Sequence, residues 1–149
     1  MPTVLLAPLS ERVRARIREL DVPARIAAWL NTAGVEAWLV GGFLRDIALG
    51  REPHDLDIAI TGDTTAIAEG IAAAFGGRAV PLDIERGVVR IVFASGATID
   101  LTRIRGGSIL ADLGERDFTV DAIAAPFSEA AGPLLDPYDG IGDLSRRLH

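Results

Sequence analysis

The chain has 149 residues, of which 49% are hydrophobic, and it carries 21 acidic against 15 basic residues, for a net charge of −6. With two histidines and no cysteine, the composition excludes a disulfide scaffold, thiolate catalysis and zinc held by cysteine. No apolar run reaches the roughly 20 residues of a membrane span, and a domain with a pI near 4.8 is a poor independent binder of DNA or RNA. We therefore expect one soluble, cytoplasmic domain with no membrane partner.

The first third of the chain predicts three helices and one strand. Alternating charges indicate a solvated face on the first helix, and Pro23 near the start of the second suits a first helical turn. Gly41 and Gly42 interrupt an apolar strand and lead directly into the third helix. The predicted helices cover 11–20, 22–32 and 43–49, and the predicted strand covers 36–40.

The rest of the chain mixes strands with helices. Residues 55–60 alternate polar and apolar side chains, which predicts a strand, and an alanine-rich helix follows it. Two β-rich segments flank Ser95-Gly96, a pair that suits a hairpin turn. The predicted helices cover 63–75 and 118–125, the strands 78–81, 88–93 and 98–104, a loop 105–114, and a turn-rich surface tail 135–143.

The order of these elements predicts the fold class. Strands and helices mix, but they do not alternate one for one as they would around a fully parallel sheet. The chain also shows no internal repeat, low-complexity tract or linker. We therefore expect an α/β or α+β fold, with a small mixed β-sheet and helices packed on one face of it.

The first candidate site motif is Gly41-Gly42-Phe43-Leu44-Arg45-Asp46, between a strand and a short helix. Glycine amides can approach an anion closely, and a helix N-terminus adds partial positive charge. Arg45, in the first turn, has the fork geometry that binds two phosphate oxygens. The motif predicts a phosphate site. Its alternative is an ordinary glycine turn beside a surface arginine.

The second motif is Asp55-Leu56-Asp57 on the predicted strand 55–60. Positions i and i+2 of a strand share a face, so we expect the two carboxylates to point the same way. Two such carboxylates repel each other unless a cation lies between them, and oxygen ligands of this kind suit Mg²⁺. The alternative is that they are charges on an edge strand that deter aggregation.

Two later segments carry further candidates. Asp100 lies mid-strand in an apolar setting, so it is a third oxygen ligand or a base if its strand neighbours that of Asp55. Arg116 could reach a phosphate or a ribose, and Asp117 is a candidate N-cap for the predicted helix 118–125. A solvent-facing strand residue and an ordinary helix start are the alternatives.

Together the four features form a set suited to nucleotidyl transfer. Such a site binds a triphosphate, holds two metal ions about 3.5–4 Å apart and activates an attacking hydroxyl. Each feature alone is weak, but their order and spacing favour this chemistry over four unrelated surface features.

At these residues the chain resembles the head domain of class II tRNA nucleotidyltransferases and bacterial poly(A) polymerases. The similarity runs from about Gly34 to Leu144 and rests on several motifs in order. It implies a nucleotidyltransferase fold, with residues 1–33 as N-terminal helices packed on a head domain of 34–149. The matching segments are Leu39–Arg51, His54–Ile58, Asp112–Ala122 and Leu135–Leu144.

The resemblance implies a reaction and a role for each matched position. An RNA 3′-hydroxyl, as at the end of a tRNA, would attack the α-phosphate of CTP or ATP, with Mg²⁺ as cofactor and pyrophosphate as leaving group. DNA is not expected as a partner. The implied catalytic residues are Asp55, Asp57 and Asp100, the first two being metal ligands. The implied nucleotide-binding residues are Gly41, Gly42, Arg45, Arg116 and Asp117.

Three departures from the family pattern leave alternatives open. Glu115 replaces an arginine, Asp121 replaces an asparagine, and the sequence stops at His149, before the family's base-selecting and tRNA-binding segments. We therefore expect a catalytic head that is weakly active or inactive alone. The alternatives are the head of a poly(A) polymerase or of a CC- or A-adding enzyme and, in another class, a catalytically silent nucleotide-binding module.

Overall fold

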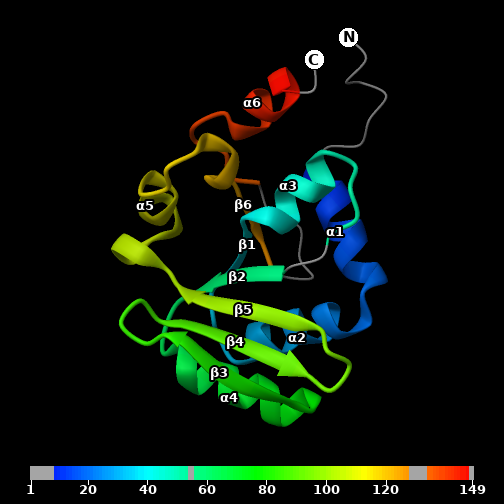
Figure 1. The fold of residues 1–149 in the computed structure, drawn as a ribbon, viewed down its shortest axis with the longest axis vertical. Helices are drawn as coiled ribbons and strands as arrows, with labels where there is room; N and C mark the ends of the chain where they lie inside the picture. Colours follow the sequence, from blue (N-terminus) through cyan, green and yellow to red (C-terminus); the bar gives the residue numbers. More distant parts are fainter. Residues whose placement is uncertain (1–8, 54–55, 128–133, 148–149) are drawn as a thin grey trace.

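A six-stranded mixed β-sheet forms the centre of the computed structural model, which describes residues 9–53, 56–127 and 134–147 (Figure 1). The strand order is β3-β4-β5-β2-β1-β6, in which β2 and β5 run parallel and every other neighbouring pair runs antiparallel. The strands are β1 (Ala37–Val40), β2 (Leu56–Ile60), β3 (Gly77–Asp83), β4 (Val88–Phe93), β5 (Thr98–Arg103) and β6 (Ala124–Pro126). The mixed sheet confirms the predicted fold class.

Six α-helices and two short 3₁₀ turns accompany the sheet in the described part of the chain. The helices are α1 (Leu9–Glu19), α2 (Asp21–Thr32), α3 (Gly42–Ala48), α4 (Thr64–Phe75), α5 (Ile109–Gly114) and α6 (Gly140–Arg147). The 3₁₀ turns are η2 (Arg105–Gly107) and η3 (Thr119–Asp121). Among these described segments, no helix is long and apolar enough to cross a membrane.

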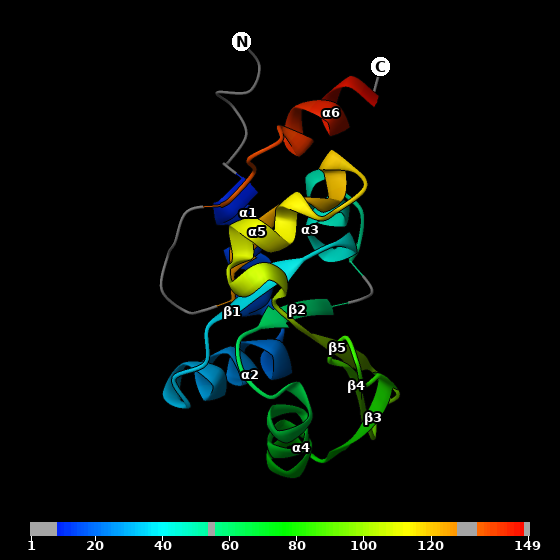
Figure 2. The same cartoon turned by 90° about the vertical axis from the view of Figure 1, so that its left-hand side faces the viewer.

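The first four helices cover one face of the sheet. Figure 2 shows α2 and α4 on one side of β3, β4 and β5. Alternate strand residues point into this core, and Leu39, Ile58, Ile91 and Leu101 are fully buried against helix residues such as Ile26. Because alternate residues of a strand face opposite ways, the same register sends Asp57 and Asp100 to the other face.

The second face is covered only in part. Ile109 and Leu113 of α5 pack on Val40, Ala59 and neighbouring residues, and form a separate small core. This core covers the face near β1, β2 and β6. Polar side chains of β2 and β5, among them Asp57 and Asp100, line a cleft on the same face.

Two sequence expectations are wrong in the segment after β5. The predicted loop 105–114 contains α5, whose Ser108 side chain accepts a hydrogen bond from the Ala111 amide at 3.1 Å. The predicted helix 118–125 is instead the turn η3 followed by β6. Ala124 pairs with Val40 and with Leu135. The buried backbone around Ala124 needs hydrogen-bond partners, and pairing at the edge of the sheet provides them.

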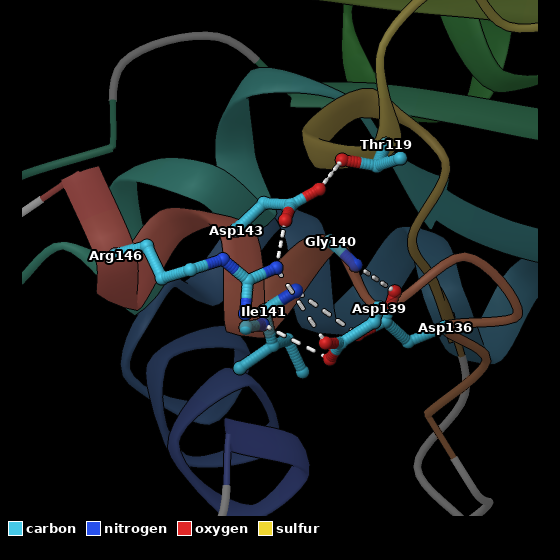
Figure 3. Close-up of polar contacts among 8 residues, drawn as sticks. Thr119, Asp136, Asp139, Gly140, Ile141, Asp143 and Arg146 are labelled. Carbon is cyan, nitrogen blue, oxygen red and sulfur yellow. Dashed lines mark hydrogen bonds and ion pairs between the residues drawn. The ribbon is translucent and has the colours of Figure 1, made fainter.

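The predicted turn-rich tail ends in a packed helix. The Asp136 carboxylate accepts hydrogen bonds from the amides of Gly140 at 2.6 Å and Ile141 at 3.0 Å, and so caps α6 (Figure 3). The Thr119 hydroxyl donates to the Asp143 carboxylate, which ties α6 to η3. Pro137, Tyr138 and Asp139 are exposed as predicted, whereas Leu144 is buried in the main core.

Candidate functional site

The cleft on the second face has a volume of about 530 Å³ and is lined mainly by charged side chains. Its arginines come from the ends of strands and from the segment around α5, and its carboxylates come from β2, β5 and the same segment. The arginines are Arg86, Arg103, Arg105 and Arg116. The acidic residues are Asp57, Asp100, Asp112, Glu115, Asp117 and Asp121.

The glycine bend lies at one edge of this cleft. Gly41 ends β1 with φ of 72°, a left-handed conformation that favours glycine, and α3 begins at Gly42. A Cβ atom on Gly41 would lie 3.1 Å from Oδ2 of Asp57. The structure therefore brings the bend against the second carboxylate of the Asp55-Leu56-Asp57 motif.

Arg45 lies beside the bend but does not line the cleft. A Cβ atom on Gly42 would be 3.2 Å from Nη2 of Arg45, so the guanidinium lies over the second glycine. Arg45 also forms a loose ion pair with Asp46, with 3.8 Å between Nε and Oδ1. Because Gly42 lines the cleft, the half-exposed Arg45 side chain lies at its rim.

Two predicted carboxylates face each other on neighbouring strands. In the parallel pairing of β2 with β5, Asp57 is directly opposite Asp100, and both line the cleft. Neighbouring strands are about 4.8 Å apart, so the two carboxylates share one small region. This confirms that the Asp100 strand neighbours the strand of the motif. Asp55 lies outside the described residues, so its alignment with Asp57 stays a prediction.

The donor set fits a hard divalent cation. Asp57 and Asp100 offer carboxylate oxygens, which Mg²⁺ and similar ions prefer, and the bare Cα of Gly41 leaves room beside them. Among the residues that the structure describes, no group of three or more acidic or histidine side chains is close enough to hold a metal. A cation here would therefore use Asp57, with Asp100 or with the undescribed Asp55.

Asp100 is already engaged by an arginine that the sequence analysis did not single out. Arg90 donates from Nε to Oδ1 at 2.8 Å and from Nη2 to Oδ2 at 3.1 Å. The two residues are directly opposite in the antiparallel pairing of β4 with β5. The signal was present in the sequence, because a hairpin centred on Ser95 places residue 90 opposite residue 100.

Arg116 is held in the cleft wall by a buried carboxylate. Asp112 is 2% exposed, and its Oδ1 accepts hydrogen bonds from Arg116 Nε at 3.2 Å and Nη2 at 2.9 Å. Its Oδ2 accepts from the Arg105 amide at 2.9 Å. Asp112 therefore orients the predicted nucleotide-binding arginine and closes the turn before α5.

The remaining predicted residue, Asp117, and its neighbour Glu115 also line this cleft. Asp117 lines the cleft, but the residue preceding η3 is Phe118, so the expected N-cap role of Asp117 is wrong. Glu115 also lines the cleft, one residue before Arg116. The sequence analysis missed the other cleft arginines, because only the fold brings the strand ends together; they are Arg86, Arg103 and Arg105.

The mixed sheet and the charged cleft beside the glycine bend belong to a nucleotidyltransferase fold, as the similar solved structures show. A CCA-adding enzyme solved in complex with CTP superposes with a TM-score of 0.81 at 26% identity, over 94% of this chain and 35% of that one. The Thermotoga maritima CCA-adding enzyme complexed with tRNA superposes with a TM-score of 0.80 at 27% identity, over 93% of this chain and 34% of that one.

The family follows from similarity in sequence. The poly A polymerase head domain model matches residues 37–148, and the chain belongs to this family. The CC-adding tRNA nucleotidyltransferase of Geobacter sulfurreducens is 41% identical over 128 residues, which is 85% of this chain and 29% of that protein. The chain thus spans about a third of the length of the proteins it matches.

Proposed function

We propose that this chain is the catalytic head of a tRNA nucleotidyltransferase, which transfers nucleotides from CTP or ATP to an RNA 3′-hydroxyl. The observation that carries the proposal is the glycine bend at Gly41 placed against Asp57, with Asp100 directly opposite on the next strand. This arrangement brings phosphate-binding amides and metal-binding oxygens into one cleft. The similarity to proteins named as CC-adding and CCA-adding enzymes supports the same reaction.

The nucleotide would be held from both sides of the cleft. The amides at Gly41 and Gly42 would face the triphosphate, and Arg45 at the rim would supply a guanidinium for its outer oxygens. From the opposite wall Arg116, fixed by Asp112, would bind a phosphate or the ribose, with Asp117 beside it. These contacts fix the triphosphate without selecting a base.

The acidic side of the cleft would hold the cofactor, for which we propose Mg²⁺. Asp55 and Asp57 are the proposed ligands, and Asp100 is the further acidic residue. The ion would neutralise charge on the phosphates. The protein's part is to position these carboxylates and the substrate hydroxyl, because positioning and charge neutralisation dominate this kind of catalysis.

Calorimetric titration of CTP and of ATP, with and without Mg²⁺, tests this proposal. The wild-type chain should bind both nucleotides in a Mg²⁺-dependent way. D57N should bind them at least about tenfold more weakly and with no benefit from Mg²⁺, because it removes a metal ligand. The matched control is D21N on α2, a residue whose side chain is 82% exposed. Equal binding by D57N and the wild type would reject the site.

Glu115 favours a second candidate, a nucleotide-binding module without catalysis. It places a negative charge in the cleft wall next to Arg116, where the anionic substrate would pass. Incubating the longest natural reading frame with labelled CTP or ATP and tRNA that lacks its CCA end separates the two candidates. We expect transfer by that protein, and slow transfer or none, with little base preference, by the 149-residue chain. Binding without any transfer by the longer protein, even with E115R, would favour the silent module.

The contacts in the cleft do not distinguish which nucleotides the enzyme adds to the RNA end. Heads of CC-adding, CCA-adding and poly(A)-adding enzymes would share the contacts described above, since none of these contacts reads a base edge. Transfer assays on the longest natural reading frame, with CTP alone, ATP alone and both, distinguish the three products. The cytoplasmic location expected from the sequence stays a prediction.

A further inference from the structure

The ion pair between Arg90 and Asp100 occupies the carboxylate that the sequence predicts as a further acidic site residue. Arg90 reaches both oxygens of Asp100, at 2.8 Å and 3.1 Å. The pairing of β4 with β5 places the two residues directly opposite each other. A cation that binds Asp100 therefore has to compete with the guanidinium for these two oxygens.

The sheet register extends this pair into a row of charges. Asp57 on β2 is opposite Asp100 on β5, and Asp100 is opposite Arg90 on β4. Like charges directly opposite on neighbouring strands destabilise a sheet, and a cation next to them removes the penalty. In this row Arg90 offsets the repulsion between Asp57 and Asp100, which is also what a divalent cation would do.

The pair is exposed enough to be exchanged. The Arg90 side chain is 43% exposed and that of Asp100 is 22% exposed. Solvent competes for both partners of such a pair, so it contributes little to stability. A divalent cation prefers carboxylate oxygens and carries twice the charge, so it can replace the guanidinium.

We propose that Arg90 is a positioning residue that occupies Asp100 until a divalent cation takes its place. The released guanidinium then adds a positive charge to the cleft for the anionic nucleotide. The inference rests on the proposed function, because the cation belongs to that site. It adds a competition between Arg90 and the metal, which makes Asp100 available only when the cation is present.

Titration of Mn²⁺ alone, without nucleotide, into the 149-residue chain tests the competition. We expect R90M to bind Mn²⁺ about two- to fivefold more tightly than the wild type, the range that corresponds to losing an exposed ion pair. D100N should bind more weakly. The double variant R90M/D100N should bind Mn²⁺ no more tightly than D100N, because without the Asp100 carboxylate the removal of Arg90 frees no ligand.

Two further variants distinguish competition for Asp100 from a general effect of removing a positive charge, and thermal melts exclude an effect of misfolding. R18M removes an arginine from the exposed end of α1 and should leave Mn²⁺ affinity at the wild-type value. R90K keeps the positive charge but loses the two-point contact, so its Mn²⁺ affinity should fall between those of the wild type and R90M. A thermal melt of each variant checks that it is folded.

Three results would overturn the inference. If R90M binds Mn²⁺ no more tightly than the wild type, Arg90 does not compete with the cation. If R90M tightens binding equally in the D100N background, the gain comes from general electrostatics. If Mn²⁺ binds D57N as it binds the wild type, the proposed metal site itself fails, which also removes the proposed function. The first two results leave the proposed function intact.

Discussion

Two aspartate–arginine pairs stand at the cleft, where Asp100, Asp112 and Arg116 line it and Arg90 reaches Asp100 from the neighbouring strand β4. Asp112 and Arg116 are joined by two hydrogen bonds, as are Asp100 and Arg90. Asp112 is 2% exposed, whereas Asp100 is 22% exposed and Arg90 is 43% exposed. In the first pair one oxygen of Asp112 accepts both hydrogen bonds, whereas in the second each oxygen of Asp100 accepts one. The two pairs differ further in the burial of the aspartate.

This difference assigns them different tasks. Breaking a buried pair leaves an uncompensated charge, which is costly, so Asp112 and Arg116 form a fixed wall of the cleft. Water screens an exposed pair, so either residue can change its partner at low cost in free energy. Asp100 and Arg90 therefore form a floor of the cleft whose ion pair can open. One side of the cleft is thus built to stay in place and the other to respond to ions.

The largest effect is expected from breaking the buried pair with R116M. The free energy of unfolding should fall by about 3–5 kcal/mol, because the buried Asp112 carboxylate loses its ion pair and keeps only the hydrogen bond from the Arg105 amide. Urea denaturation monitored by circular dichroism measures this. As a control, the double variant D112L/R116M should recover part of the loss, since it removes the buried charge. A loss below about 1 kcal/mol for R116M would show that the wall is not held by this pair.

Some parts of the cleft could be predicted from the local sequence and others could not. The glycine bend and the strand that follows it depend on neighbouring residues, so local patterns were enough to single out Gly41, Gly42 and Asp57, which line the cleft. The hairpin 88–104 was also predicted, and with it the strand of Asp100. The register that pairs Arg90 with Asp100 went unpredicted, although the position of the turn nearly fixes it.

The segment after β5 was mispredicted for a physical reason. Its apolar residues are buried between α5 and the sheet, and fully buried runs lack the periodicity that separates a helix from a strand. Ala124 is in a strand because β1 offers a free edge, which no local pattern reveals. Asp112 was likewise passed over, because its importance comes from burial beside Arg116.

A smaller effect is expected from the turn that brings the Arg105 amide to Asp112. Gly106 has φ of 68°, and a Cβ atom there would lie 2.8 Å from Cβ of Ala111. G106A should therefore destabilise the chain by about 2 kcal/mol, from backbone strain and crowding together. Gly107 is the matched control, because its φ is 82° but nothing lies within 4 Å of its added Cβ.

The two glycine variants should differ in a second measurement. Hydrogen exchange at the Arg105 amide should be faster in G106A than in G107A, because only the first displaces the turn from α5. If G106A and G107A lose equal stability and exchange at equal rates, the turn tolerates the added Cβ atom. The buried pair then does not depend on the exact position of the turn.

The smallest effect is expected from R90M, the same substitution as in the buried pair. The free energy of unfolding should change by less than about 1 kcal/mol, because water takes over the contacts of the Asp100 carboxylate. Raising NaCl from about 0.05 to about 0.5 M should shrink even this difference, since salt screens exposed charges but affects a buried pair much less. Urea denaturation of R90M and R116M side by side at both salt concentrations provides the measurement. If R90M proves as destabilising as R116M, the floor is as fixed as the wall, and Asp100 could not change partners when a cation arrives.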